Sequence, residues 1–97
     1  MDKIITKEEA RAIVENRIAL YPQPESDKYM VLDEHTIEKE WGWVFFYQSR
    51  KYVETGDFGY VLAGNAPYIV NRLTGELRLT GTAYPIEHYI QEYEKTL

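Results

Sequence analysis

Residues 41–47 form the segment that most constrains the fold of this 97-residue chain. In an extended strand, successive side chains point to opposite faces. The two faces of this segment carry Trp43, Phe45 and Tyr47 on one side and Val44 and Phe46 on the other. Because both faces are apolar, the segment predicts a central strand that is covered by a helix on at least one side. Residues 29–37 are rich in strand-forming side chains, and we expect them to pair with it as a hairpin.

Two segments near the ends of the chain have the three- and four-residue apolar spacing of amphipathic helices. The first follows a capping box formed by Thr6 and Glu9, and it ends before Pro22 and Pro24. Its apolar stripe consists of Ala10, Ile13, Val14, Ile18 and Tyr21. The second has Pro85 at its first helical position, and its stripe consists of Ile86, Tyr89, Ile90, Tyr93 and Leu97. Each stripe is too apolar to face water, so we expect both helices to cover the sheet.

Two further strands are predicted over residues 67–71 and 76–80, because Gly75 supplies the positive φ of a tight hairpin between them. Residues 50–65 form a long and partly irregular connection. The order of helix, strands and helix lacks the alternation of a parallel sheet. The prediction is therefore an α+β fold, a single domain over residues 1–97, with an antiparallel sheet of about four strands and a helix at each end packed on that sheet.

Composition and charge exclude several functional classes. Eleven Lys and Arg against sixteen Asp and Glu give a formal net charge of −5, which disfavours nucleic acid as a partner. The same charge either attracts a basic protein or only maintains solubility. The chain has no cysteine, which excludes disulfides and thiolate chemistry. It also has no apolar run of membrane-spanning length and no N-terminal signal pattern, so we expect a cytoplasmic protein that has no membrane partner.

No arrangement of side chains predicts an enzyme, a metal site or a cofactor. His35 and His88 do not have the spacing of metal ligands. The serines and glycines form neither a nucleophile elbow nor a phosphate-binding loop. Glu54 and Asp57 can be read as the acid–base pair of a hydrolase, but a Gly–Asp turn explains them without any chemistry.

Acidic and aromatic side chains are instead candidates for binding a protein. The acids around the predicted first hairpin either steer a basic partner or discourage pairing of sheet edges. The tyrosines of the long connection either anchor a partner or, together with Phe58, form a lid that closes the core. The candidate binding residues are Asp33, Glu34, Glu38, Glu40, Tyr52, Glu54, Asp57 and Tyr60.

An ordered set of motifs covers most of the chain from residue 43 onward. The motifs are Trp43-Val44-Phe45-Phe46-Tyr47-Gln48-Ser49, Tyr52-Val53-Glu54-Thr55-Gly56-Asp57, Leu62-Ala63-Gly64-Asn65-Ala66-Pro67-Tyr68-Ile69-Val70, Thr74-Gly75-Glu76, Gly81-Thr82-Ala83 and Pro85-Ile86-Glu87-His88-Tyr89-Ile90-Gln91-Glu92-Tyr93. This set resembles the immunity protein 35 family of bacterial polymorphic-toxin systems. The resemblance implies an α+β protein, encoded beside a toxin, that binds and blocks that toxin without catalysis. It assigns no individual toxin contacts.

A function of a different class is a general holding domain, which binds unfolded chains through exposed aromatic side chains. A toxin gene adjacent to the gene for this chain would favour the immunity function, because a holding domain needs no such neighbour. The sequence leaves the identity of the toxin and the oligomeric state open.

Overall fold

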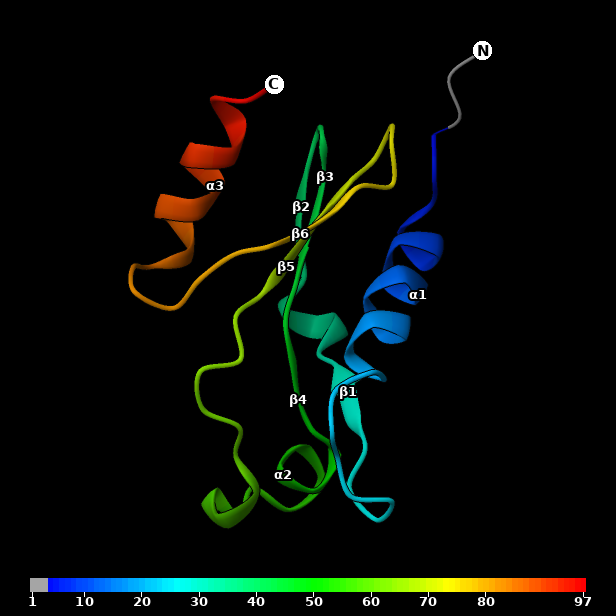
Figure 1. The fold of residues 1–97 in the computed structure, drawn as a ribbon, viewed down its shortest axis with the longest axis vertical. Coiled ribbons are helices and arrows are strands. Elements are labelled where there is room, and N and C mark those ends of the chain that lie inside the picture. Colours follow the sequence, from blue (N-terminus) through cyan, green and yellow to red (C-terminus); the bar gives the residue numbers. More distant parts are fainter. Residues whose placement is uncertain (1–3) are drawn as a thin grey trace.

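The computed structural model describes residues 4–97 as an α+β fold with three layers (Figure 1). The middle layer is an antiparallel sheet with the strand order β2-β3-β5-β6. Its strands are β2 (Ile37–Lys39), β3 (Gly42–Phe45), β5 (Tyr68–Asn71) and β6 (Leu77–Leu79). Helix α1 (Lys7–Ile18) covers one face and helix α3 (Ile86–Glu94) covers the other. The predicted fold class and the packing of both helices on the sheet are therefore confirmed.

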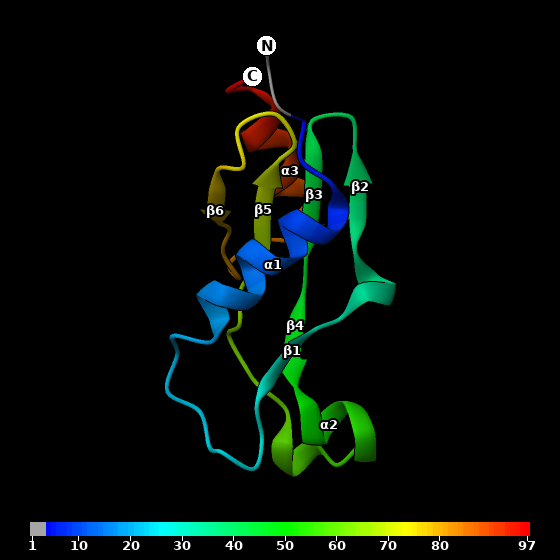
Figure 2. The same ribbon diagram turned by 90° about the vertical axis from the view of Figure 1, so that its right-hand side faces the viewer.

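The hairpin predicted over residues 29–47 is present, but it is divided into two separate ladders. Strand β1 (Tyr29–Val31) pairs with β4 (Tyr47–Ser49), whereas β2 pairs with β3. The pairs Val31–Tyr47 and Ile37–Val44 are separated by five residues (32–36) on one side of the hairpin and by two residues (45–46) on the other. The excess residues form a short 3₁₀ helix, η1 (Asp33–His35). The β1–β4 pair, called the ribbon below, extends beyond the four-stranded sheet (Figure 2).

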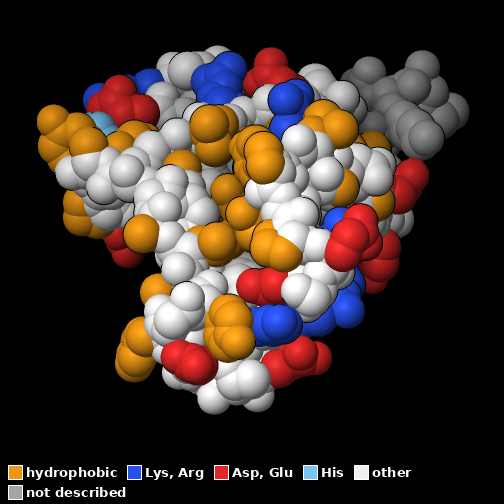
Figure 3. Space-filling model, turned by 60° about the horizontal axis from the view of Figure 1, so that its bottom comes forward, with side chains coloured by type: hydrophobic (Ala, Val, Ile, Leu, Met, Phe, Trp, Pro, Cys, Tyr) orange, Lys and Arg blue, Asp and Glu red, His pale blue; other side chains and the backbone are white. Residues whose placement is uncertain are grey.

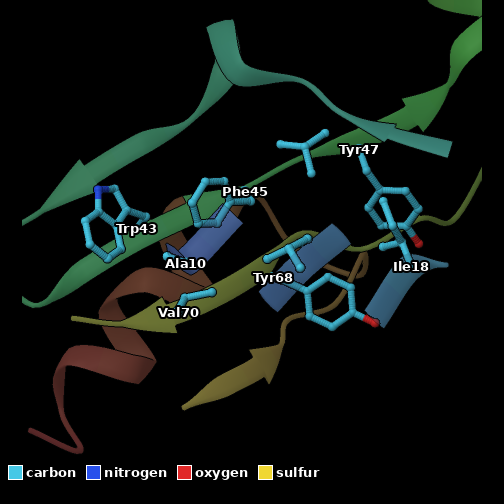
Figure 4. Close-up of a cluster of buried hydrophobic side chains, with 9 residues drawn as sticks. Ala10, Ile18, Trp43, Phe45, Tyr47, Tyr68 and Val70 are labelled. Carbon is cyan, nitrogen blue, oxygen red and sulfur yellow. The ribbon is translucent and has the colours of Figure 1, made fainter. Parts of the chain in front are cut away.

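Strand β3 is buried on both faces, as its sequence predicts. On the α1 side, Trp43, Phe45 and Tyr47 pack in a buried cluster with residues of α1 and β5 (Figure 4). The α1 residues of this cluster are Ala10, Val14 and Ile18. On the α3 side, Val44 packs with Ile69, Ile90 and Tyr93. Alternate side chains along this strand therefore pack toward α1 and toward α3, which gives the core two halves.

Arg72 fastens the β2–β3 hairpin to β5. Its guanidinium lies 4.4 Å from the centre of the Trp43 ring and donates to the backbone carbonyls of Lys39 and Glu40. At the same turn Gly42 has φ +154, and a Cβ built there would lie 2.0 Å from a carbonyl oxygen of β5. A side chain at this position would separate the two strands, so the close pairing of β3 with β5 requires glycine.

The connection predicted to be partly irregular contains a short helix, α2 (Arg50–Thr55), and a 3₁₀ turn, η2 (Phe58–Tyr60). The Ser49 hydroxyl caps α2 by accepting from the Tyr52 amide at 3.2 Å. The same hydroxyl donates to the Asp27 carboxylate at 2.7 Å, and Asp27 also accepts from the Lys51 amide at 3.0 Å. The Lys51 amide and the Ser49 hydroxyl together lower the pKa of Asp27 below its ordinary value. Gly56, with φ +71, ends the helix.

Docking of α1 on the sheet predicts a large cost for truncating its most buried side chains. Ile18 is 2% exposed, so Ile18→Ala is expected to lower the free energy of unfolding by about 2–5 kcal/mol. Ile13 is only partly buried, so Ile13→Ala should lower the free energy of unfolding by less. The matched control is Leu20→Ala, which should change it little because Leu20 is 75% exposed. Urea unfolding measures all three, and a loss below about 0.5 kcal/mol for Ile18→Ala would contradict the docking.

The Asp27 network predicts a pH dependence of stability. Because the folded-state pKa of Asp27 is lowered, its ionised form stabilises the fold above about pH 4, and this contribution is lost as the pH falls through the folded pKa. Asp27→Asn should therefore lower the urea midpoint at pH 7, and the difference from the wild type should narrow between pH 5 and pH 2. A difference that stays constant over this range would show that the carboxylate charge does not act through these hydrogen bonds.

Candidate functional site

A groove of about 490 Å³ lies on the outer face of the ribbon. Val31 and Tyr47 point from the ribbon into the core, so Met30 and Gln48, which pair with each other, point to the opposite face and form the floor of the groove. One wall is η1 and the other is α2, which lie on the same side of the ribbon in Figure 2. We call this hollow the ribbon groove.

The η1 wall of the ribbon groove is acidic. Asp33 and Glu34 line it together with His35, and Arg11 reaches the groove from α1. Arg11 forms ion pairs with Asp33 and, at 3.3 Å, with Glu15. Among the described residues, Glu34 has no hydrogen bond or ion pair, so its carboxylate is available to a basic group of a partner.

The segment from α2 to residue 61 forms a projecting lobe with an apolar surface. Four of its large side chains are exposed: Val53, Phe58, Tyr60 and Val61. Phe58 is 77% exposed, and its ring packs on the Tyr52 ring, with the two centres 5.9 Å apart. Figure 3 shows hydrophobic side chains across the face that includes this end of the molecule, with acidic side chains among them. These exposed side chains do not form a lid over the core.

The apolar lobe, residues 50–61, is fastened to β4 at both ends. At its start, the hydrogen bonds of Ser49 and Asp27 fix the first turn of α2. Beyond its end, the Gln48 side-chain oxygen accepts from the Leu62 amide at 2.6 Å, and the Asn65 side chain donates to the Tyr47 carbonyl at 2.7 Å. The lobe therefore presents its apolar side chains from a backbone held by buried and half-buried polar contacts.

The structure distributes the eight predicted binding residues over three places. Asp33, Glu34 and Tyr52 line the ribbon groove together. Glu54, Asp57 and Tyr60 lie on the apolar lobe. Glu38 and Glu40 lie instead at the β2–β3 hairpin, where Glu38 forms an ion pair with Arg72 at 3.2 Å. The acids near the first hairpin therefore do not form one continuous surface.

The structure bears on the two interpretations of Glu54 and Asp57. The Asp57 carboxylate accepts from the Gly59 amide at 2.8 Å, as the first residue of a capped turn does, which agrees with the turn interpretation of Glu54 and Asp57.

Within residues 4–97, no group of three or more His, Cys, Asp or Glu side chains is placed to hold a metal ion. None of the helices in these residues is long and apolar enough to cross a membrane.

Sequence reasoning missed several residues of this site. The sequence indicates Phe58 only as part of a lid, and it does not indicate Val53, Val61, Met30 or Gln48 as site residues. The available signal was the density of apolar side chains in a connection that contains three glycines, Gly56, Gly59 and Gly64, and no helical or strand periodicity. Apolar residues without periodicity have no regular element to bury them, which favours exposure on a lobe.

Known proteins that resemble this chain place it in a family. Residues 8–94 match the family model described as Immunity protein 35. The chain is also similar to the uncharacterized protein YrhB of Escherichia coli strain K12, with 49% identity over 53 residues. That match covers 55% of this chain and 56% of YrhB, so it spans about half the length of this curated relative. No solved structure matches the chain. Because the family model matches nearly the whole sequence, the chain belongs to the immunity protein 35 family.

Proposed function

We propose that this chain is a bacterial immunity protein that binds a cognate toxin and covers its active surface without catalysing a reaction. The family match supports an immunity function, and one structural observation supports binding: the apolar lobe beside the ribbon groove. Single exposed apolar side chains are common on soluble proteins, but a group on one projecting segment marks an interaction surface. The partner is a toxin protein encoded by an adjacent gene, and the protein acts in the cytoplasm.

Aromatic side chains on the lobe supply the proposed anchors. Phe58 and Tyr60 are exposed, and rings of this kind bury a large area at a small cost in side-chain entropy. Tyr52 supports Phe58 from the groove side. The Lys51 ammonium lies 5.3 Å from the centre of the Tyr60 ring. Each of the two exposed rings therefore has a neighbouring side chain that favours its position before binding.

Acidic side chains surround these anchors and supply the proposed steering. Glu34 lies on the groove wall and Glu54 on α2, and both are exposed and free of ion pairs among the described residues. Charges at the edge of an interface raise the association rate of an oppositely charged partner more than they slow dissociation. A toxin with a basic surface around its active site fits this arrangement and the net charge of −5.

The anchor hypothesis predicts a loss of affinity without a loss of stability. Phe58→Ala should raise the dissociation rate of the complex with the adjacent-gene toxin and weaken binding by about 2 kcal/mol or more, which is about thirtyfold in Kd. The control is Leu73→Ala, because Leu73 is also exposed but lies on the β5–β6 turn. Surface-immobilised binding kinetics and survival of toxin-expressing cells are the readouts.

The results of this experiment separate the functional classes. If Phe58→Ala binds and protects as the wild type does, the lobe is not the interface. If the wild-type protein does not bind the toxin but prevents aggregation of an unrelated denatured enzyme, a general holding function replaces the immunity function.

The steering hypothesis predicts a change in the association rate. Reversing two charges with Glu34→Lys and Glu54→Lys should slow association by roughly tenfold at low salt and flatten its salt dependence. Glu40→Lys with Glu87→Lys is the matched control, because it changes the net charge equally at exposed positions outside the groove and the lobe. Stopped-flow association at several salt concentrations measures both. Equal slowing by the two double variants would assign the effect to net charge alone.

A further inference from the structure

Strand β6 forms an unpaired edge of the four-stranded sheet. It is the last strand in the order β2-β3-β5-β6, and within the described part of the chain only β5 pairs with it. In Figure 2, β6 lies at one side of the sheet and β2 at the other, and α2 lies at the far end of the molecule. This edge is therefore separate from the apolar lobe.

The pairing with β5 decides which backbone groups of β6 point outward. The Thr80 amide donates to the Pro67 carbonyl at 3.0 Å. In an antiparallel ladder every second residue bonds to the neighbouring strand, so Arg78 also bonds to β5, and the amides and carbonyls of Leu77 and Leu79 point away from it. None of these four outward groups has a hydrogen-bond partner among the described residues. They are available to a further strand.

The side chains of this edge differ between its two faces. On the α1 side, Leu77 packs against the core cluster and Leu79 is 55% exposed. On the α3 side, the Arg78 guanidinium lies 5.0 Å from the centre of the Tyr93 ring and forms an ion pair with Glu76 at 3.2 Å. The edge contains no proline, and its two charges are of opposite sign, so they can attract a matching strand as well as repel a mismatched one.

Pairing with a second copy of β6 brings opposite charges together in one register. Outward-pointing groups must face each other, so a two-fold axis at this edge pairs Leu77 with Leu77, Leu79 with Leu79, or Leu77 with Leu79. The first register places each Glu76 opposite Arg78 of the other copy. The second places Arg78 opposite Thr80, and the third places the two Arg78 side chains opposite each other. Facing opposite charges stabilise a strand pair and facing like charges destabilise it, which favours the first register.

We propose that two copies of this chain form a reversible dimer through their β6 edges, with the two Leu77 residues paired on the two-fold axis. The Leu77 amide of each copy donates to the Leu77 carbonyl of the other. On the α3 side, each Arg78 lies between Glu76 of its own chain and Glu76 of the other copy, so four charges alternate in sign. On the α1 side, Leu79 lies opposite Gly75 of the other copy, which has no side chain to obstruct it. This contact uses neither the ribbon groove nor the apolar lobe.

The test is sedimentation equilibrium of the untagged protein from about 10 µM to about 1 mM, and it uses no toxin. The wild type is expected to change reversibly from monomer to dimer over this range. Arg78→Glu should weaken self-association by at least about tenfold, because both facing pairs become Glu with Glu. The matched control is Arg50→Glu, on α2, which changes the net charge equally and should dimerise as the wild type does.

A mixing experiment separates facing charges from net charge. Glu76→Arg alone should also stay monomeric, because both facing pairs become Arg with Arg. An equimolar mixture of the Arg78→Glu and Glu76→Arg proteins should associate, because every facing pair is again of opposite charge. Both variants remain net negative, since each changes the charge of −5 by two, so net charge does not draw them together. Circular dichroism checks that each variant is folded.

A protein that stays monomeric over the whole concentration range would overturn the proposal. Wild-type self-association in Arg78→Glu, or a mixture of the two variants that does not associate, would also overturn it. The amide resonance of Leu77 locates the contact and should shift as the wild-type concentration rises. Shifts confined to residues 50–61 would place self-association on the apolar lobe, and a Leu77 shift seen only with added toxin would assign the edge to a strand of the toxin. Either result excludes the β6 dimer.

Discussion

The continuity of β3 and β4 is the constraint on which the rest of the structure depends. These two strands are one extended segment, residues 42–49, interrupted only at Phe46, whose carbonyl accepts from the Leu32 amide at 2.8 Å. The first part is central in the four-stranded sheet and the second part belongs to the ribbon. Because Trp43, Phe45 and Tyr47 stay on the α1 side throughout, the ribbon has a core face and an outer face that follow directly from those of the sheet. The outer face carries the ribbon groove.

The elements that could be predicted are those encoded by contacts between residues close in the chain. The capping box of Thr6 and Glu9 is formed as predicted, and Gly75 has the positive φ that its hairpin requires. The division of the first hairpin could not be predicted, because it depends on the register between strands, and side-chain alternation does not fix how many residues separate two paired positions. Helix α2 has local signals at Ser49 and Gly56, but its six residues are too few to show apolar periodicity. Leu97 was predicted to continue the last stripe, yet it lies beyond the end of α3 and is exposed.

Residue type alone does not determine where the candidate binding residues lie in the structure. Asp33 and Glu40 are seven residues apart, but strand β2 advances about 3.3 Å per residue and carries Glu38 and Glu40 away from η1. Conversely, Tyr52 and Asp33 are far apart in sequence and meet in the ribbon groove because β1 pairs with β4. Phe58 and Phe45 are the same residue type, so residue type does not tell which of them is exposed. Only the elements around each ring decide that Phe45 is buried and Phe58 is not.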